Sequence, residues 1–254
     1  MTKFAALFDI HYGHERRNGH KVPLHDLKAF GATYAFLQDF KPDVIILGGD
    51  ILDCNPISHH NKGKPGRTEG LRLASDAQGC REDIITPLEA LKATKNVYIL
   101  GNHEDWLSDL AEDQPGLEGL VDAKHLLSLN KWQVEPQGGR FRLGKLWFMH
   151  GDTLGGGANV TRKAVTDGGR SLRFGHFHTY AATTKVSFLD ENCGHTAVAV
   201  PCLCGREPKY GQGRGNSWVQ GFNWGYVNSD GTFSDYVSVI TNGKFAANGK
   251  VYRG

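Results

Sequence analysis

The chain has 254 residues, 39% hydrophobic and 22% charged, a balance typical of a globular protein with a sizeable core. Its 29 basic and 27 acidic residues leave a net charge of only +2, so bulk charge does not indicate a nucleic-acid binder, although a local basic patch stays open. No segment has the roughly 18 consecutive apolar residues of a membrane helix. Five cysteines without zinc-ribbon spacing favour reduced thiols, and we expect a soluble, cytoplasmic protein with no membrane partner.

The first third of the chain alternates between strand and helix patterns. We predict a strand over residues 4–8, a helix over 23–41 and a second strand over 44–47, whose four apolar residues are typical of a strand buried on both faces. This order favours parallel pairing of the two strands. Residues 14–21 and 54–80 are polar or irregular, and we expect both to be loops.

The remaining elements are shorter and separated by many turns, as expected for a chain with 33 glycines. We predict helices over residues 84–95 and 158–165, two more within 107–129, a strand over 97–100 and a hairpin within 141–149. Four later strands are expected to complete a second sheet, at residues 186–188, 196–200, 225–227 and 236–240. Because no linker, repeat or low-complexity tract interrupts the chain, we expect one domain over residues 1–254.

Polar side chains with metal-binding chemistry follow five of the predicted strands. The five motifs are Asp9-Ile10-His11, Gly49-Asp50-Ile51-Leu52-Asp53, Gly101-Asn102-His103-Glu104, His150-Gly151-Asp152 and Gly175-His176-Phe177-His178. Imidazole nitrogens and carboxyl or amide oxygens bind borderline divalent metals. A lone histidine at a strand end is more often a hydrogen-bonded structural residue. Five such motifs at the edge where α/β sheets bind ligands indicate a metal site.

In these motifs and their order, residues 8–178 resemble the calcineurin-like metallophosphoesterases. The resemblance implies a four-layer αββα sandwich, in which two mixed β-sheets are flanked by helices, with a two-metal site at the strand ends. The implied ligands of one metal are Asp9, His11 and His178, those of the other are Asn102, His150 and His176, and Asp50 bridges the two. The resemblance also implies that His103 is the catalytic histidine.

The chemistry of these residue types agrees with the implied roles. Only a carboxylate such as Asp50 offers two oxygens to two cations roughly 3.5–4 Å apart. Bound metals would lower the pKa of a bridging water toward roughly 7 and supply a hydroxide for in-line attack on phosphorus. His103 would protonate or stabilise the departing alkoxide. Asp53 is expected to orient His103, and a plain helix cap explains Asp53 equally well.

Details of the motifs distinguish branches of the family. The first two motifs resemble DNA-repair exonucleases related to Mre, and residues 218–222 resemble phage-encoded members. Cys54 and Asn55 stand where Ser/Thr protein phosphatases have Arg-Gly, which argues against that activity. We therefore expect a dinuclear metal-dependent phosphodiesterase that acts on nucleic acid or nucleotides. The alternatives are a phosphomonoesterase or nucleotide pyrophosphatase and, from another class, a non-catalytic metal-stabilised nucleic-acid-binding protein.

Three further residues are candidate substrate contacts. His59 and Arg67 belong to a basic stretch that either contacts phosphates or is a solvated loop. Trp106 either stacks on a base or packs in a helix core. The expected partner is a phosphate ester, including DNA or a nucleotide, with no obligate protein partner. The expected cofactors are two divalent metal ions, with manganese favoured and iron, zinc or nickel left open.

Overall fold

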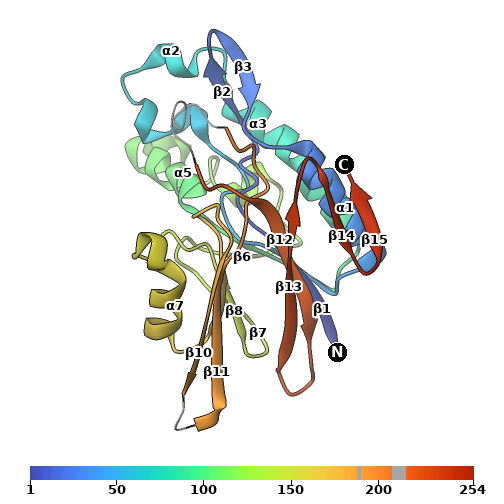
Figure 1. Ribbon diagram of the computed structural model, residues 1–254. Helices are drawn as coiled ribbons and strands as arrows, with labels where there is room; N and C mark the ends of the chain where they lie inside the picture. Colours follow the sequence, from blue (N-terminus) through green and yellow to red (C-terminus); the bar gives the residue numbers. More distant parts are fainter. Residues whose placement is uncertain (188–189, 208–215) are drawn as a thin grey trace.

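The computed structural model describes residues 1–187, 190–207 and 216–254, and it contains two large β-sheets and two small hairpin sheets (Figure 1). The strands are β1 (Thr2–Leu7), β2 (His14–Arg17), β3 (His20–Pro23), β4 (Val44–Leu47), β5 (Lys95–Ile99), β6 (Gln133–Glu135), β7 (Phe141–Leu143), β8 (Leu146–Met149), β9 (Ser171–Phe174), β10 (Ala181–Ser187), β11 (Asp190–Ala199), β12 (Gln220–Val227), β13 (Phe233–Ile240), β14 (Lys244–Ala247) and β15 (Lys250–Arg253).

Seven α-helices lie among the described residues. They are α1 (Leu27–Phe40), α2 (Pro65–Thr68), α3 (Leu73–Cys80), α4 (Thr86–Ala90), α5 (Asn102–Asp113), α6 (Ala123–Leu126) and α7 (Val160–Gly168). A π-helical segment, Arg81–Ile85, joins α3 to α4. Short 3₁₀ helices cover Asn55–Ile57, His59–Asn61, Pro115–Leu117 and Gly157–Asn159.

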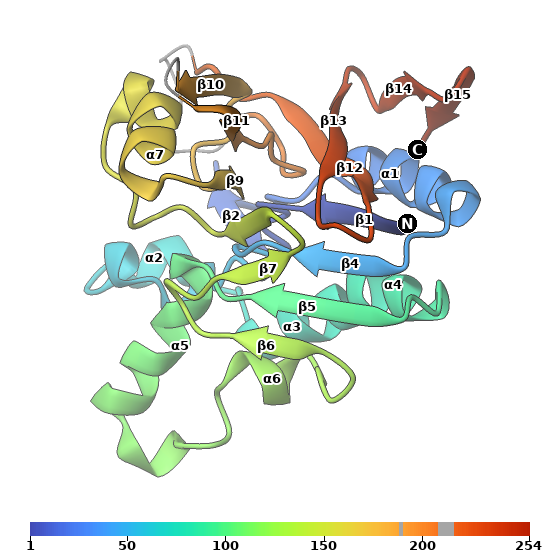
Figure 2. The same cartoon turned by 90° about the horizontal axis from the view of Figure 1, so that it is seen from below.

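Both large sheets are mixed. The first has the order β13-β12-β1-β4-β5-β6, in which β1, β4, β5 and β6 are parallel and β12 pairs antiparallel with β1 (Figure 2). The second has the order β10-β11-β9-β8-β7, in which β8, β9 and β11 are parallel. The carboxyl ends of the parallel strands therefore gather at one end of each sheet, where α/β proteins place their ligand sites.

Apolar side chains fill three layers between and outside the sheets. Phe4 of β1, Ile46 of β4 and Phe148 of β8 belong to the cluster between the sheets. On the outer face of the first sheet, Phe36 of α1 packs on Trp224 of β12, with ring centroids 5.0 Å apart, and helices α3, α4 and α6 join the same cluster. Helix α7 covers the second sheet. Burying each large side chain stabilises the fold by roughly 1.5–3 kcal/mol, and the predicted four-layer αββα sandwich is confirmed.

Local signals explain the limits of the helix that connects the first two parallel strands. The Asp26 carboxylate accepts hydrogen bonds from the backbone N–H groups of Lys28 and Ala29, which caps the start of α1. The helix ends at Phe40, and its C-cap residue Lys41 has a left-handed φ of 50°, one residue before Pro42. The β1-α1-β4 unit thus sets Asp9 and Asp50 after adjacent parallel strands.

Three predicted elements are corrected by the structure. Residues 14–21 are not a loop but begin the β2–β3 hairpin, whose turn residues Asn18 and Gly19 both have positive φ, as Asn-Gly hairpin turns require. The segment 54–80 is only partly irregular, because α3 begins at Leu73. Strands β12 and β13 join the first sheet rather than the second, because β12 pairs with β1.

Other differences concern element limits. The helix predicted over residues 84–95 ends at Ala90, and the β14–β15 hairpin was not predicted. Phe188, in the strand predicted over residues 186–188, lies outside the described residues. Cys54, Cys80, Cys202 and Cys204 are free thiols. Across residues 1–187, 190–207 and 216–254, no helix combines the length and apolar character needed to cross a bilayer.

Candidate metal centre

The predicted metal ligands lie together at the carboxyl ends of β1, β4, β8 and β9 and the amino end of α5. The backbone of several is strained: φ is 52° at Asp9, 49° at His11, 52° at Asp50, 68° at His176 and 54° at His178. Positive φ is uncommon for residues other than glycine and concentrates at functional sites. The loops after the strands thus hold costly conformations that aim these side chains inward.

The first cluster gathers His11, His178 and Asp9. The Nε2 atoms of His11 and His178 are 3.2 Å apart, and His178 Nε2 is 3.4 Å from Asp9 Oδ1. Asp50 Oδ2 lies 3.8 Å from His11 Nε2. All four residues are at most 6% exposed. Four ligand atoms from three loops therefore converge on one buried point.

The second cluster gathers His150, Asn102 and His176 around the same aspartate. His150 Nε2 is 3.1 Å from Asn102 Oδ1 and 3.2 Å from Asp50 Oδ2, and His176 completes the group. The other ring nitrogen of His150 lies 3.0 Å from the Gly48 carbonyl and donates to it, which leaves Nε2 facing the cluster. Asp50 is common to both clusters, so all seven predicted ligands form one two-part site.

Glycine at position 49 gives the His150 ring its room. Gly49 has φ of +97°, and a Cβ there would lie 2.4 Å from His150 Nδ1. Any other residue would displace the imidazole or the strand end that carries it.

Charges in the site favour ionised carboxylates. Burial raises the pKa of Asp50, but the imidazoles of His150 and His103 outweigh burial and hold that pKa well below its ordinary value. Burial likewise raises the pKa of Asp9, and His178 brings it below the ordinary value. For His150, burial lowers the pKa and Asp50 raises it to about 10. Two buried anions thus stand among imidazoles that would lose their protons to a bound metal.

The donor set fits two divalent cations. Two ionised carboxylates, four imidazoles and one amide oxygen are the mixed nitrogen and oxygen ligands that such metals take. The facing Nε2 atoms of His11 and His178 cannot both be lone-pair acceptors at 3.2 Å without a proton or a cation between them. One oxygen of Asp50, Oδ2, contacts imidazoles of both clusters, so this carboxylate stands between the two groups of ligands.

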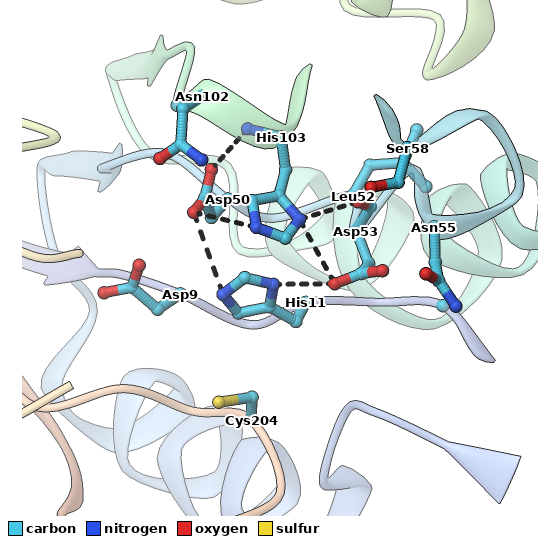
Figure 3. Close-up of polar contacts among 12 residues, drawn as sticks. Asp9, His11, Asp50, Leu52, Asp53, Asn55, Ser58, Asn102, His103 and Cys204 are labelled. Atoms are coloured by element: carbon cyan, nitrogen blue, oxygen red, sulfur yellow. Dashed lines mark hydrogen bonds and ion pairs between the residues drawn. The ribbon is translucent and has the colours of Figure 1, made fainter. Parts of the chain in front are cut away.

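His103 lies between Asp50 and Asp53 and contacts both (Figure 3). Its Nδ1–H donates to the Asp53 carbonyl over 2.8 Å, and its backbone N–H donates to Asp50 Oδ1 over 2.9 Å. Its Nε2 lies 3.9 Å from Asp50 Oδ2. Burial lowers the pKa of His103, while Asp50 and Asp53 raise it to about 10. The ring therefore presents a protonated nitrogen toward the site.

Asp53 positions two imidazoles at once. Its Oδ2 lies 2.8 Å from His11 Nδ1 and 3.3 Å from His103 Nδ1. Burial raises the pKa of Asp53, but His103 and His11 lower it to about 2, so the carboxylate is ionised. The 3₁₀ helix that follows has Cys54 as its N-cap and receives no side-chain cap hydrogen bond. The contacts of Asp53 are thus with the rings rather than with a helix end.

Glu104 was not among the predicted site residues. Its buried carboxylate accepts backbone N–H bonds of 2.7–2.9 Å from Asp50, Ile51, Leu52 and Gly101, and one from the Tyr98 hydroxyl. It therefore fixes the backbone that carries Asp50. Its place at the third helical residue after Gly101, the position of the acid in a capping box, was the available signal.

Cys204 also lies at the site. Its Sγ is 3.9 Å from His178 Nδ1, and it forms a compact group with His11 and His178. Burial raises the pKa of this thiol well above its ordinary value. The Cys-x-Cys spacing of Cys202 and Cys204 did not predict this position, because Cys202 does not belong to the group formed by Cys204, His11 and His178.

The three predicted substrate contacts differ in exposure. A cavity of about 880 Å³ opens beside His103, and His59, Arg67 and Trp106 all line it. His59 and Arg67 are exposed. Trp106 is only 7% exposed and packs on His103, with ring centroids 4.2 Å apart. Its faces are thus largely occupied by protein.

Comparisons with known proteins identify the family of this chain. A family model described as calcineurin-like phosphoesterase matches residues 2–185. The Gene 54 proteins of Mycobacterium phages L5 and D29 are each 23% identical, over 91% of this chain and 95% of each relative. Among solved structures, Chaetomium thermophilum Vps29 has a TM-score of 0.48 at 11% identity, covering 100% of this chain and 97% of that one. A dimetal phosphatase from Danio rerio has a TM-score of 0.48 at 11% identity, covering 93% and 98%.

The family match includes all five strand-end motifs, from Asp9 to His178. It covers most of the chain and the whole of the two-part ligand site. The chain therefore belongs to the calcineurin-like phosphoesterase family and is a metal-dependent phosphoesterase.

Proposed function

We propose that this phosphoesterase hydrolyses phosphodiester bonds of nucleic acid or nucleotides, with two divalent metal ions, manganese first among them. The observation that carries the proposal is the shared Asp50, whose Oδ2 lies 3.8 Å from His11 Nε2 in one cluster and 3.2 Å from His150 Nε2 in the other, with His103 next to it. When bound, the cations would acidify a water and neutralise charge on the phosphoryl oxygens.

The chain itself supplies the charge balance and the ligand geometry. Asp9 and Asp50 bring two negative charges, so two divalent cations leave an excess of positive charge for an anionic ester. Asp53 holds His11 through Nδ1, which keeps His11 Nε2 directed at the first cluster.

His103 is placed to serve the leaving group. Its Nδ1–H is used by the Asp53 carbonyl, so Nε2 is the nitrogen free to give a proton to a departing alkoxide. Packing against Trp106 limits rotation of the ring. Alkoxides are poor leaving groups without such a proton, which favours a role in ester cleavage.

The cavity supports a diester rather than a monoester. Its volume of about 880 Å³ far exceeds that of one phosphate, and His103 is part of its lining. A diester has a second organic group to place, and the cavity offers room for it.

The test compares hydrolysis of bis(p-nitrophenyl) phosphate and p-nitrophenyl phosphate by protein stripped with chelator and reloaded with manganese, iron, zinc or nickel. We expect faster diester hydrolysis, and a loss of about 10²–10⁴-fold in His103→Ala with metal content retained. The matched control is His125→Ala, which removes an exposed imidazole on α6 and should change neither rate. Faster monoester hydrolysis would contradict the proposal and favour a phosphomonoesterase.

A further inference from the structure

One wall of the cavity has no part in the proposed chemistry. We call it the basic wall, and it consists of His59, His60, Lys64 and Arg67. All four side chains are exposed. His103, at the edge of the metal site, lines the same cavity, so the wall is continuous with the reacting centre.

The basic wall is a built segment rather than a loose loop. The Ser58 hydroxyl accepts from the His60 backbone N–H, and Asn61 Nδ2 donates to Asn55 Oδ1 over 2.9 Å. Arg16 of β2 donates to the Glu69 carbonyl over 3.0 Å and pairs with its carboxylate, which joins the hairpin to the segment after α2. Figure 1 shows α2 beside the β2–β3 hairpin at one end of the molecule.

The charge of this wall is positive and uncompensated. The acids lining the cavity are Glu15 and Asp53, and each is already paired, Glu15 with Arg17 and Asp53 with His11 and His103. Lys64 Nζ contacts the His60 carbonyl at 3.2 Å. Within the described part of the chain, no carboxylate pairs with Lys64 or Arg67. The cavity therefore places two available cations beyond the metal site.

Flat rings lie between the metal site and these cations. The rings of His59 and His60 are 4.0 Å apart and stand 5.3 and 6.0 Å from Trp106, which in turn packs on His103. Exposed aromatic rings beside a positive groove are the combination with which proteins bind single-stranded nucleic acid, because bases stack and phosphates pair with cations.

We infer that this cavity binds single-stranded nucleic acid, with a base against His59 and His60 and a phosphate next to the scissile one at Lys64 and Arg67. The inference rests on the proposed phosphodiesterase activity and names its substrate class. A cavity of about 880 Å³ is large enough for a few nucleotides of a splayed strand.

The test is equilibrium binding of fluorescein-labelled octathymidylate to manganese-loaded His103→Ala protein, followed by anisotropy between 50 and 300 mM salt. In that background, Lys64→Gln with Arg67→Gln should weaken binding at 50 mM salt at least tenfold. It should also reduce the slope of log K against log salt by about 0.7, since the two side chains share one phosphate and each phosphate neutralised on a single strand contributes about 0.7.

The matched control removes the same two charges elsewhere. Lys244→Gln with Arg253→Gln, in the same His103→Ala background, alters an exposed pair on β14 and β15. The slope of log K against log salt for this control should equal that of the His103→Ala parent. Equal slopes for the two double variants, absence of oligonucleotide binding at 50 mM salt, or equal competition by a duplex of the same length would each overturn the inference. Failure of the proposed activity appears separately, as wild-type protein that hydrolyses no phosphodiester.

Discussion

The two halves of the functional region, the metal site and the basic wall of the cavity beside it, are built in opposite ways. The metal-site half is made of buried, strained residues: Asp9, Asp50 and His150 are at most 2% exposed, and the first two have positive φ. The half formed by the basic wall is made of exposed side chains on short 3₁₀ and helical turns. Chemistry that needs fixed geometry thus sits in the buried half, and contacts that only need charge and flat rings sit in the exposed half.

Substitution of the shared ligand should have the largest effect. Asp50→Asn keeps the shape of the side chain but removes its charge and one of its two anionic oxygens. We expect phosphodiesterase activity to fall by more than about 10³-fold, because both clusters lose their common ligand. Metal content measured after gel filtration should fall in parallel. Full activity in this variant would show that the two clusters do not act together.

Loss of the support beneath Asp50 should have an intermediate effect. In Glu104→Gln, an N–H₂ group would face either the N–H groups of Asp50 and Gly101 or those of Ile51 and Leu52. We expect about 1–3 kcal/mol of lost stability in urea unfolding and a 10–100-fold lower kcat/KM. Glu112→Gln, on the exposed side of the same helix, is the control and should change neither value.

The basic wall should tolerate substitution best. Lys64→Gln with Arg67→Gln alters two exposed side chains, so the free energy of unfolding should stay within about 0.5 kcal/mol of wild type. Urea unfolding of this double variant, with His103 intact, measures the free energy of unfolding. A destabilisation as large as that of Glu104→Gln would mean that the wall side chains support the fold as the buried half does, and it would remove the contrast between the two halves.

The sequence predicted the metal-site half better than the rest of the fold. A buried parallel strand such as residues 44–47 is recognisable locally, and its carboxyl end must lie at the ligand-binding edge, so Asp50 could be placed without a structure. Strands β12 and β13 were assigned to the wrong sheet because their pairing depends on β1, more than 200 residues away in the chain. No local pattern carries that information.

The side chains that were missed act through distant or backbone partners. Glu104 serves backbone N–H groups some 50 residues away, and Cys204 reaches His178 across 26 residues. The sequence predicted that Asp53 orients His103. It missed, for the same reason, that the shorter contact of Asp53 is with His11. Residue type and spacing indicate which groups could bind metals, whereas the groups that hold those side chains in place emerge only from the packed structure.

The most direct test of the shared-ligand site is the electron paramagnetic resonance spectrum of protein titrated with manganese. We predict that two manganese ions bind each chain and give the spectrum of an exchange-coupled pair, because one Asp50 carboxylate would connect them. In Asp50→Asn the coupling should disappear. Binding of one equivalent, or two equivalents with the spectrum of isolated ions in the wild-type protein, would contradict a dinuclear centre built on Asp50.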